Sequence, residues 1–394
     1  MNILFVAPFK ISGITGGVGR VTATLAKSFL AANHQVYYYA TATAAESMMD
    51  GVPQFYAADA SQPDSAKNVV ALQSLLEQFK IDIVINQAGF TLPIIRLLVA
   101  AKSEGQKIIT VHHNCIQCLY ENYKSIITNN FKKKWWFNMV NHPFFWKFIS
   151  SKFKKRFAKE IEEVIIGSDR LMLLAPGYVS EIEFFLGKHD YSHKLGWFFN
   201  PAPFEANKLA LDIKENRVVY VGGLKSTQKR IERVTEIWIQ LSALHPNWQL
   251  DIVGDGPARM QMERRFKETN TKNYFFHGFA DPRPYLEKAK YFIMTSDFEG
   301  FPMVLVEAQA YGVVPFLFDC ISLVGTVLVD QKNCRVIPSF DLTIYIDSLG
   351  EMMKQDDLRT AMLNDVQESV ALYEKELIAS QWLALCSDLK SPKV

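Results

Sequence analysis

Short apolar segments alternate with longer amphipathic ones along the first half of the chain, and few folds accommodate this order. The segments with the apolar, β-branched character of buried strands are 3–7, 35–40, 81–86, 107–112 and 170–174. Segments such as 18–32 and 65–79 lie between them and have helical periodicity. Strands that alternate with helices indicate βαβ units, so we predict a parallel sheet covered by helices on both faces.

The same order restarts after Asn200-Pro-Ala-Pro203, where two prolines favour an extended connection. The second set of predicted strands is 217–221, 249–253, 274–277, 291–295 and 314–318, and helices are expected to begin near Lys229, Pro257, Pro282 and Met303. A chain of 394 residues is also long for a single core. The sequence therefore predicts an α/β protein with two Rossmann-like, doubly wound domains.

The linker prolines and the end of the second alternation set the domain boundaries. We place an N-terminal domain at 1–199, a linker at 200–206 and a C-terminal domain at 207–373. The amphipathic segment 374–394 follows the last strand, and we expect it to form a helix that packs back on the N-terminal domain.

The sequence argues against two classes of protein, those that span a membrane and those held together by disulfides. No uncharged apolar run approaches the roughly 20 residues that span a bilayer, so we expect no membrane-spanning helix and a cytoplasmic location. The five cysteines are scattered and odd in number, which argues against a disulfide framework. Cys115 and Cys118 have the spacing of a zinc-ligand pair, but no second close pair of Cys or His accompanies them, so we predict no metal site.

Two glycine-rich loops follow predicted strands, where open α/β sheets bind ligands. The first contains Gly16 and Gly17, which let backbone approach a phosphate closely or simply form a tight turn. Its spacing is not G-x-G-x-x-G and the second strand ends without an acid, so NAD binding is disfavoured. The other loop leads to Lys229 and Arg230 at a helix start. Cations there oppose the helix dipole, and an anion bound between them would offset this cost. The alternative is a solvated helix start that binds no ligand.

Glu299 and Glu307 form the most informative pair of residues in the sequence. If a helix begins near Met303, one carboxylate lies in the loop before it and the other about one turn inside, so both can face one ligand. Carboxylates accept charge-assisted hydrogen bonds from sugar and ribose hydroxyls, and free N–H groups at a helix start suit phosphate or sugar oxygens. The pair is therefore suited to a ligand that carries hydroxyl groups and phosphate.

The context of this pair, Thr295-Ser296 before it and Ala310-Tyr-Gly-Val-Val-Pro315 after it, resembles the family-four retaining glycosyltransferases. The resemblance extends over the Gly16-Gly17 loop, the strand end at His112, the helix start at 175–181, Asn200-Pro, Lys229 and Val253-Gly-Asp-Gly-Pro257. It implies the GT-B fold, with the nucleotide sugar held mainly by the C-terminal domain, the acceptor mainly by the N-terminal domain, and catalysis in the cleft between them.

The resemblance also implies roles for individual residues. Glu299 and the backbone of Gly300, Phe301, Pro302 and Met303 would hold the donor sugar, Glu307 the ribose and Lys229 the diphosphate, while Gly16 and Gly17 would approach the diphosphate and His277 would lie near the base. His112 would contact the transferred sugar at the reaction centre, with His113 as the fallback. The family usually has an arginine where this chain has Gly223, and Arg230 or Lys225 could replace it; we prefer Arg230.

The activity implied is hexosyl or N-acetylhexosaminyl transfer with retention, from a donor that we expect to be UDP-linked. The leaving phosphate helps to deprotonate the acceptor in this family, so no protein nucleophile, metal or cofactor is expected. The sequence also has no Asp-x-Asp motif.

The segment 131–157, here called the basic aromatic segment, contains seven Lys and one Arg with no Asp or Glu, and ten aromatic residues. Such a composition is typical of surfaces that bind anionic bilayers, each cation adding roughly 1 kcal/mol. Nucleic-acid binding and simple packing of the aromatics into the core are the alternatives. We favour peripheral attachment to the inner face of the cell membrane and a lipid-linked glycan acceptor, without nucleic acid. A soluble glycan or a protein is the alternative acceptor.

The sequence leaves three functions open. The first is a glycosyltransferase of cell-surface polysaccharide or lipopolysaccharide biosynthesis, which the resemblance favours. A nucleotide-sugar epimerase of the same fold would bind the same donor, and a noncatalytic membrane-associated partner would have a degenerate site.

Overall fold

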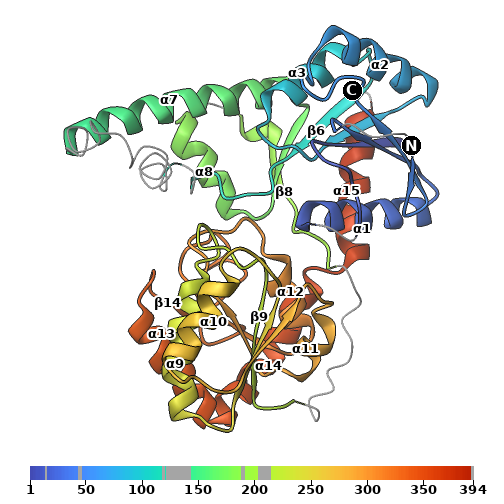
Figure 1. Cartoon of the computed structure of the whole chain (residues 1–394). Coiled ribbons are helices and arrows are strands. Elements are labelled where there is room, and N and C mark those ends of the chain that lie inside the picture. The colour runs from blue at the N-terminus through green and yellow to red at the C-terminus, as the bar shows by residue number, and fades with distance from the viewer. Residues whose placement is uncertain are drawn as a thin grey trace. The chain divides into compact units, whose positions relative to one another are not determined.

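The computed structural model describes residues 1–13, 16–42, 47–117, 120, 143–187, 191–202 and 214–391. These residues form two compact units, and the chain crosses between them twice. The N-terminal unit comprises Met1–Pro201 together with Lys375–Val394, and the C-terminal unit comprises Ala202–Glu374 (Figure 1). Each unit is described by itself below.

An eight-stranded sheet forms the centre of the N-terminal unit, in the order β3-β4-β2-β1-β5-β6-β7-β8. Its strands are β1 (Asn2–Ala7), β2 (Gln35–Ala40), β3 (Ser47–Met49), β4 (Val52–Tyr56), β5 (Ile83–Asn86), β6 (Lys107–Val111), β7 (Arg170–Leu173) and β8 (Leu195–Trp197). All neighbours pair in parallel except β3 and β4. Strands β1, β5 and β6 are buried almost throughout, as a parallel sheet covered on both faces requires.

Helices connect these strands as the alternation predicts. They are α1 (Gly17–Ala31), α2 (Ala66–Gln78), α3 (Leu92–Ala101), α7 (Pro143–Gly167), α8 (Gly177–Leu186) and a 3₁₀ turn at Ser192–Lys194. The last helix of the chain, α15 (Lys375–Lys390), lies beside α1 in this unit, as Figure 1 shows. Lys390 Nζ donates to Asp82 at 2.7 Å, and Trp382 packs against Phe198.

The C-terminal unit contains a parallel six-stranded sheet in the order β11-β10-β9-β12-β13-β14. Its strands are β9 (Arg217–Val221), β10 (Gln249–Val253), β11 (Tyr274–Gly278), β12 (Tyr291–Met294), β13 (Val314–Phe318) and β14 (Arg335–Ile337). Counted from β9, this is the 3-2-1-4-5-6 order of a doubly wound nucleotide-binding sheet. The first three strands run outward on one side and the next three on the other, so the order reverses between β9 and β12.

The helices of this unit are α9 (Ile231–Leu244), α10 (Arg259–Glu268), α11 (Arg283–Lys288), α12 (Met303–Ala310), α13 (Leu342–Lys354) and α14 (Asp356–Ala371). One core packs α9, α10 and α13 against one face of the sheet, with Trp238, Tyr345 and Phe266 among its fully buried side chains. The two Rossmann-like folds predicted from the sequence are confirmed.

Strand β8, strand β14 and the β3–β4 hairpin were absent from the sequence prediction. Each of β3, β8 and β14 has three residues, which is too short to produce a recognisable alternation of apolar and polar side chains. Partners in the sheet, rather than local pattern, define them.

Candidate active site

The carboxyl ends of β9 and β12 lie side by side at the point where the strand order of the C-terminal sheet reverses. In a doubly wound sheet the loops that leave two such strands diverge and open a crevice for ligand. The loop after β9 carries Lys229 and Arg230, and the loop after β12 carries Asp297 and Glu299. The fold therefore brings together cations and carboxylates that are about 70 residues apart in sequence.

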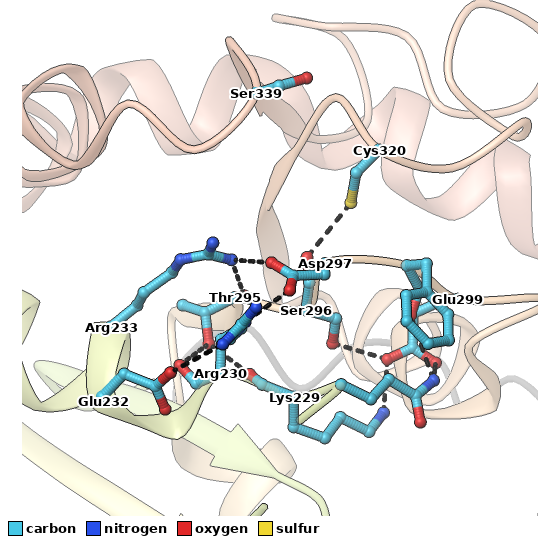
Figure 2. A network of polar contacts seen from close by, with 12 residues as sticks. Lys229, Arg230, Glu232, Arg233, Thr295, Ser296, Asp297, Glu299, Cys320 and Ser339 are labelled. Atoms are coloured by element: carbon cyan, nitrogen blue, oxygen red, sulfur yellow. Dashed lines mark hydrogen bonds and ion pairs between the residues drawn. The ribbon is translucent and has the colours of Figure 1, made fainter. Parts of the chain in front are cut away.

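Glu299 is the centre of a compact polar cluster (Figure 2). Lys229 Nζ donates to its Oε1 at 2.6 Å, and Ser296 Oγ donates to the same oxygen at 2.6 Å. Gln228 Nε2 lies 3.4 Å from the other carboxylate oxygen and 3.1 Å from the carbonyl oxygen of Phe298. Because Glu299 is only 7% exposed, these donors compensate the loss of water around its charge.

A second cluster, around Asp297, fixes the loop that carries these groups. Arg230 Nε donates to Asp297 Oδ2, and Arg233 Nη1 forms an ion pair with Oδ1 at 2.7 Å. Arg230 has a φ of 47°, an uncommon left-handed conformation for a bulky residue directly before α9. The hydroxyl of Thr295 donates to the carbonyl oxygen of Lys229 at 3.0 Å, and the N–H of Asp297 donates to that of Gln228 at 2.9 Å, so the two loops are joined by backbone as well as side-chain contacts.

Cys320 lies beside this network, with Sγ donating to the carbonyl oxygen of Ser296 at 3.3 Å (Figure 2). Burial raises the pKa of the thiol to about 12, with the carboxylates of Glu299 and Asp297 adding to the effect. A thiolate is the nucleophilic form of cysteine, so Cys320 does not supply a nucleophile here at neutral pH.

Helix α12 begins at Met303, as the sequence predicts, with Pro302 in the capping position. Glu307 lies in its second turn and is 1% exposed. Gly300, Phe301 and Pro302 form the approach to the helix, and the ring of Phe301 packs edge-on against Tyr373 at 5.6 Å. The helix start and Glu299 thus come from one loop, the arrangement from which the sequence predicted a sugar site.

The side chain of His277 contacts other residues of the C-terminal unit. Its Nε2 lies 2.7 Å from Asp251, which is fully buried, and its ring packs on Tyr285 with centroids 4.1 Å apart. Arg217 also pairs with Asp251, at 3.1 Å. The His277 side chain remains 23% exposed, and Phe279 in the same loop is 87% exposed, so the prediction that this loop lies near the base stays open.

In the N-terminal unit the order of strands reverses between β1 and β5, and the predicted residues lie at these and neighbouring strand ends. Gly16 has a φ of 70° and precedes Gly17, the first residue of α1. The left-handed φ explains the glycine, since other residues rarely adopt it. Residues 14 and 15 of this loop lie outside the described part of the chain.

His112 directly follows β6 and is 8% exposed. Its ring stacks on Phe90, with centroids 4.1 Å apart, and its Nε2 has no hydrogen-bond partner among the described residues. A Cβ atom on Gly89, whose φ is 58°, would lie 2.6 Å from Nδ1 of His112. Burial, and secondarily the neighbouring His113, lowers the pKa of His112 to about 3, so the ring is neutral at physiological pH.

Gln87 belongs to the same group of side chains and was not predicted from the sequence. Its Oε1 lies within hydrogen-bond distance of His113 Nε2, while its own Nε2 and the Nδ1 of His113 have no partner among the described residues. Burial lowers the pKa of His113 to about 4. Buried polar groups without partners are rare and costly, so His112, His113 and Gln87 together are suited to receive hydroxyl groups of a ligand.

The low pKa of His112 leads to a prediction for acid stability. The unfolded chain binds a proton on this ring as the pH falls through about 6.5, but the folded chain does not. The free energy of unfolding therefore decreases as the pH falls below about 6.5. We expect the Tm of the N-terminal unit to fall between pH 6.5 and 5, at a cost of about 1 kcal/mol per pH unit from this ring.

Differential scanning calorimetry checks this expectation. His112→Asn is expected to show a shallower fall of Tm with pH than the natural chain, since asparagine does not titrate. The matched control is His193→Gln, which replaces an exposed histidine of the same unit and is expected to leave the pH dependence unchanged. An equal dependence of Tm on pH for His112→Asn and the natural chain would contradict the lowered pKa of His112.

The described part of the basic aromatic segment lies on α7, and residues 131–142 lie outside the described part of the chain. Trp146 and Phe157 are buried, and Phe157 packs edge-on against Phe90 and Phe185. The described cations of the segment are exposed except Lys154, which is half-buried over the ring of Phe184, and Phe148 is 54% exposed beside Lys152. Part of the aromatic content therefore belongs to the core. In the described ranges no helix combines the length and the apolar character that crossing a bilayer needs.

A family model matches residues in each of the two units. The model of glycosyl transferases group 1 matches residues 202–368, and the model of glycosyltransferase family 4 matches residues 15–158. The chain belongs to the family-four GT-B glycosyltransferases. Within this family, the amylovoran biosynthesis glycosyltransferase AmsD of Erwinia amylovora is 28% identical over 171 residues, which is 43% of this chain and 47% of AmsD.

A second relative is the α-1,4-N-acetyl-D-galactosaminyltransferase of Campylobacter jejuni that is named for a diphosphoundecaprenol-linked glycan. It is 23% identical over 195 residues, 49% of this chain and 54% of the relative. The chain spans about half the length of these two relatives. Among solved structures, HepE of Anabaena in complex with UDP and glucose has a TM-score of 0.72 at 13% identity and covers 98% of this chain and 100% of HepE. This likeness is one of fold.

Proposed function

We propose that this protein is a retaining glycosyltransferase that moves a sugar from a nucleotide sugar, with UDP as the expected nucleotide, to a glycan acceptor in cell-surface polysaccharide or lipopolysaccharide biosynthesis. The observation that carries the proposal is the ion pair of Lys229 with the buried Glu299, at the carboxyl ends of β9 and β12 and directly before the start of α12. One carboxylate, one ammonium and one helix N-terminus are the groups needed to hold sugar hydroxyls and a diphosphate together.

On the donor side, Glu299 accepts hydrogen bonds from the sugar hydroxyls, and the backbone N–H groups of residues 300–303 donate to its oxygens. Glu307 accepts from the ribose, and Lys229 neutralises the diphosphate. The pair of carboxylates on either side of a helix start supports this assignment. HepE, which shares the fold, was solved with UDP and glucose.

His112 is proposed to contact the transferred sugar. A neutral imidazole with a buried, unpartnered nitrogen is suited to hydrogen-bond a hydroxyl without adding charge. Departure of the diphosphate places new negative charge between Lys229 and the helix start, and stabilising that charge is the main electrostatic task of the site. The leaving phosphate takes the acceptor proton, so neither a protein nucleophile nor a metal is part of the proposal.

The proposed acceptor is a lipid-linked glycan, reached from the inner face of the cell membrane. Exposed cations on α7, together with the half-exposed Phe148, support attachment to an anionic surface. The Campylobacter relative, named for an undecaprenol-linked glycan, supports the same acceptor class.

Isothermal titration calorimetry with a panel of UDP- and GDP-sugars tests the proposal. We expect one donor to bind, and both Glu307→Ala and Lys229→Ala to weaken it by roughly tenfold or more, the value of one charge-assisted hydrogen bond. Transfer of the sugar to polyprenyl-diphosphate-linked glycans is then measured by mass spectrometry. An epimerised donor without transfer would favour an isomerase, and no binding by any nucleotide sugar would overturn the enzymatic proposal.

A further inference from the structure

The ring of Phe340 packs against the guanidinium of Arg233. Phe340 lies two residues before the start of α13, and Arg233 lies in the first turn of α9. The guanidinium carbon is 4.3 Å from the ring centroid of Phe340 and 5.4 Å from that of Phe318, and the two rings meet edge-on at 5.5 Å. Because a guanidinium is attracted to aromatic faces, the two rings favour one orientation of the arginine.

Arg233 contacts the loop that carries Glu299 (Figure 2). Its Nη1 donates to the carbonyl oxygen of Thr295 at 2.9 Å and lies 2.7 Å from Oδ1 of Asp297. That carboxylate oxygen is buried and accepts no hydrogen bond from the described residues, so the ion pair compensates it. Between these two residues lies Ser296, whose hydroxyl donates to Glu299 at 2.6 Å. A shift of the guanidinium would therefore move the loop that holds the Glu299 carboxylate.

Phe340 has a backbone conformation that stability alone does not favour. Its φ is 64°, in the left-handed region where glycine, asparagine and aspartate are the usual residues. The residue is 42% exposed, so burial of its ring offsets little of this cost. Its neighbours hold the turn: Ser339 Oγ donates to the carbonyl oxygen of Asp319 at 2.5 Å, and Asp341 accepts from the N–H of Ile344 at 3.0 Å. Strained conformations of this kind concentrate at functional sites, which points to a role for the ring beyond packing.

We propose that Phe340 is a positioning residue of the candidate active site, whose ring holds the guanidinium of Arg233 against Thr295 and Asp297. The loop between these two contacts and Glu299 then keeps the carboxylate where it meets the sugar hydroxyls. Phe340 acts through Arg233 and itself contacts no ligand. This inference rests on the proposed function, since it names a residue that acts on the same site.

Calorimetric titration of the full chain with UDP- and GDP-sugars, and with UDP and GDP themselves, tests the inference. Phe340→Gly removes the ring and suits the backbone conformation. We expect it to raise Kd for the nucleotide sugar about tenfold, because Glu299 is proposed to face the sugar, and to leave Kd for the nucleoside diphosphate within about twofold. We expect its Tm to stay within about 3 °C of the natural chain, since relief of the positive φ offsets the lost ring contacts.

Three further variants separate the ring from the backbone. Phe340→Tyr keeps the ring and is expected to bind both ligands as the natural chain does. Phe340→Asn removes the ring, tolerates the left-handed conformation, and is expected to repeat the tenfold loss if the glycine variant is too unstable to measure. Gln331→Gly is the matched control, because it relaxes another exposed residue of this unit, with a φ of 62°, and is expected to change neither affinity.

Combining Phe340→Gly with Arg233→Lys tests whether the effect passes through the arginine. Lysine keeps the positive charge but has no planar group to pack on the ring. Both substitutions disrupt the same contact, so we expect the double variant to bind the nucleotide sugar no more weakly than Arg233→Lys alone. Fully additive losses would show that Phe340 does not act through Arg233 and would overturn the proposal.

The remaining outcomes separate the inference from the function on which it rests. If the natural chain binds a nucleotide sugar and Phe340→Gly binds it within twofold, the inference fails and the proposed function stands. If Phe340→Gly weakens the nucleotide sugar and the nucleoside diphosphate equally, the ring serves the fold alone and the inference again fails. If the natural chain binds no nucleotide at all, both fail.

Discussion

Replacing Lys229 by alanine is expected to lower kcat/KM for sugar transfer by about a hundredfold to a thousandfold. Two losses combine: the diphosphate leaves without the ammonium proposed to neutralise it, and Glu299, 7% exposed, loses the donor at 2.6 Å that compensates its charge. Steady-state kinetics with the donor identified by calorimetry measures the effect. Ser296 and Gln228 still donate to the carboxylate, so we expect the Tm to change by only a few degrees.

A double-mutant cycle decides how Lys229 acts. If it only orients Glu299, then Lys229→Ala combined with Glu299→Gln is no slower than Glu299→Gln alone. We expect the combination to be slower than either single variant, because the lysine is also proposed to contact the diphosphate. Activity of Lys229→Ala within threefold of the natural chain would remove this residue from the site.

Gly254→Ala is expected to have the largest effect on stability. The added Cβ atom would lie 2.0 Å from the carbonyl oxygen of Gly222, and the φ of 140° at this position excludes ordinary side chains. Neither atom moves freely, since Gly254 N–H donates to Gly278 at 2.7 Å and Gly222 N–H to Val253 at 2.9 Å. We expect a cost of at least about 3 kcal/mol, a Tm of the C-terminal unit lower by about 10 °C, and loss of nucleotide binding.

Gly223→Ala is the matched control for this substitution, one residue beyond the blocked carbonyl. Its new Cβ atom would meet only the flexible side chain of Lys225, at 3.7 Å. Calorimetric scans are expected to place its Tm within about 2 °C of the natural chain. Equal Tm values for the two alanine variants would show that the close approach of Gly254 to the carbonyl oxygen of Gly222 does not exclude a side chain at position 254.

The fold followed from the sequence to a large extent, because its central strands have strong local signals. Strands β2, β9, β10 and β13 have the predicted bounds, and α12 begins at the predicted residue. Both strands of the β3–β4 hairpin and the strands β8 and β14 were missed. Three of these four have only three residues, and a strand so short is defined by the neighbour to which it hydrogen-bonds. The final amphipathic segment forms α15, which belongs to the N-terminal unit.

The sequence by itself determined the residue types of the candidate site, because glycines, paired glutamates and cations at strand ends follow from local backbone and chemical requirements. Tertiary structure decided which charges are free. Glu299 compensates Lys229, Asp297 compensates Arg230, and Lys225 is left uncompensated among the described residues. It also grouped Gln87 with His113. These outcomes depend on distances between loops that are adjacent in the sheet and distant in the chain, and no local pattern encodes such distances.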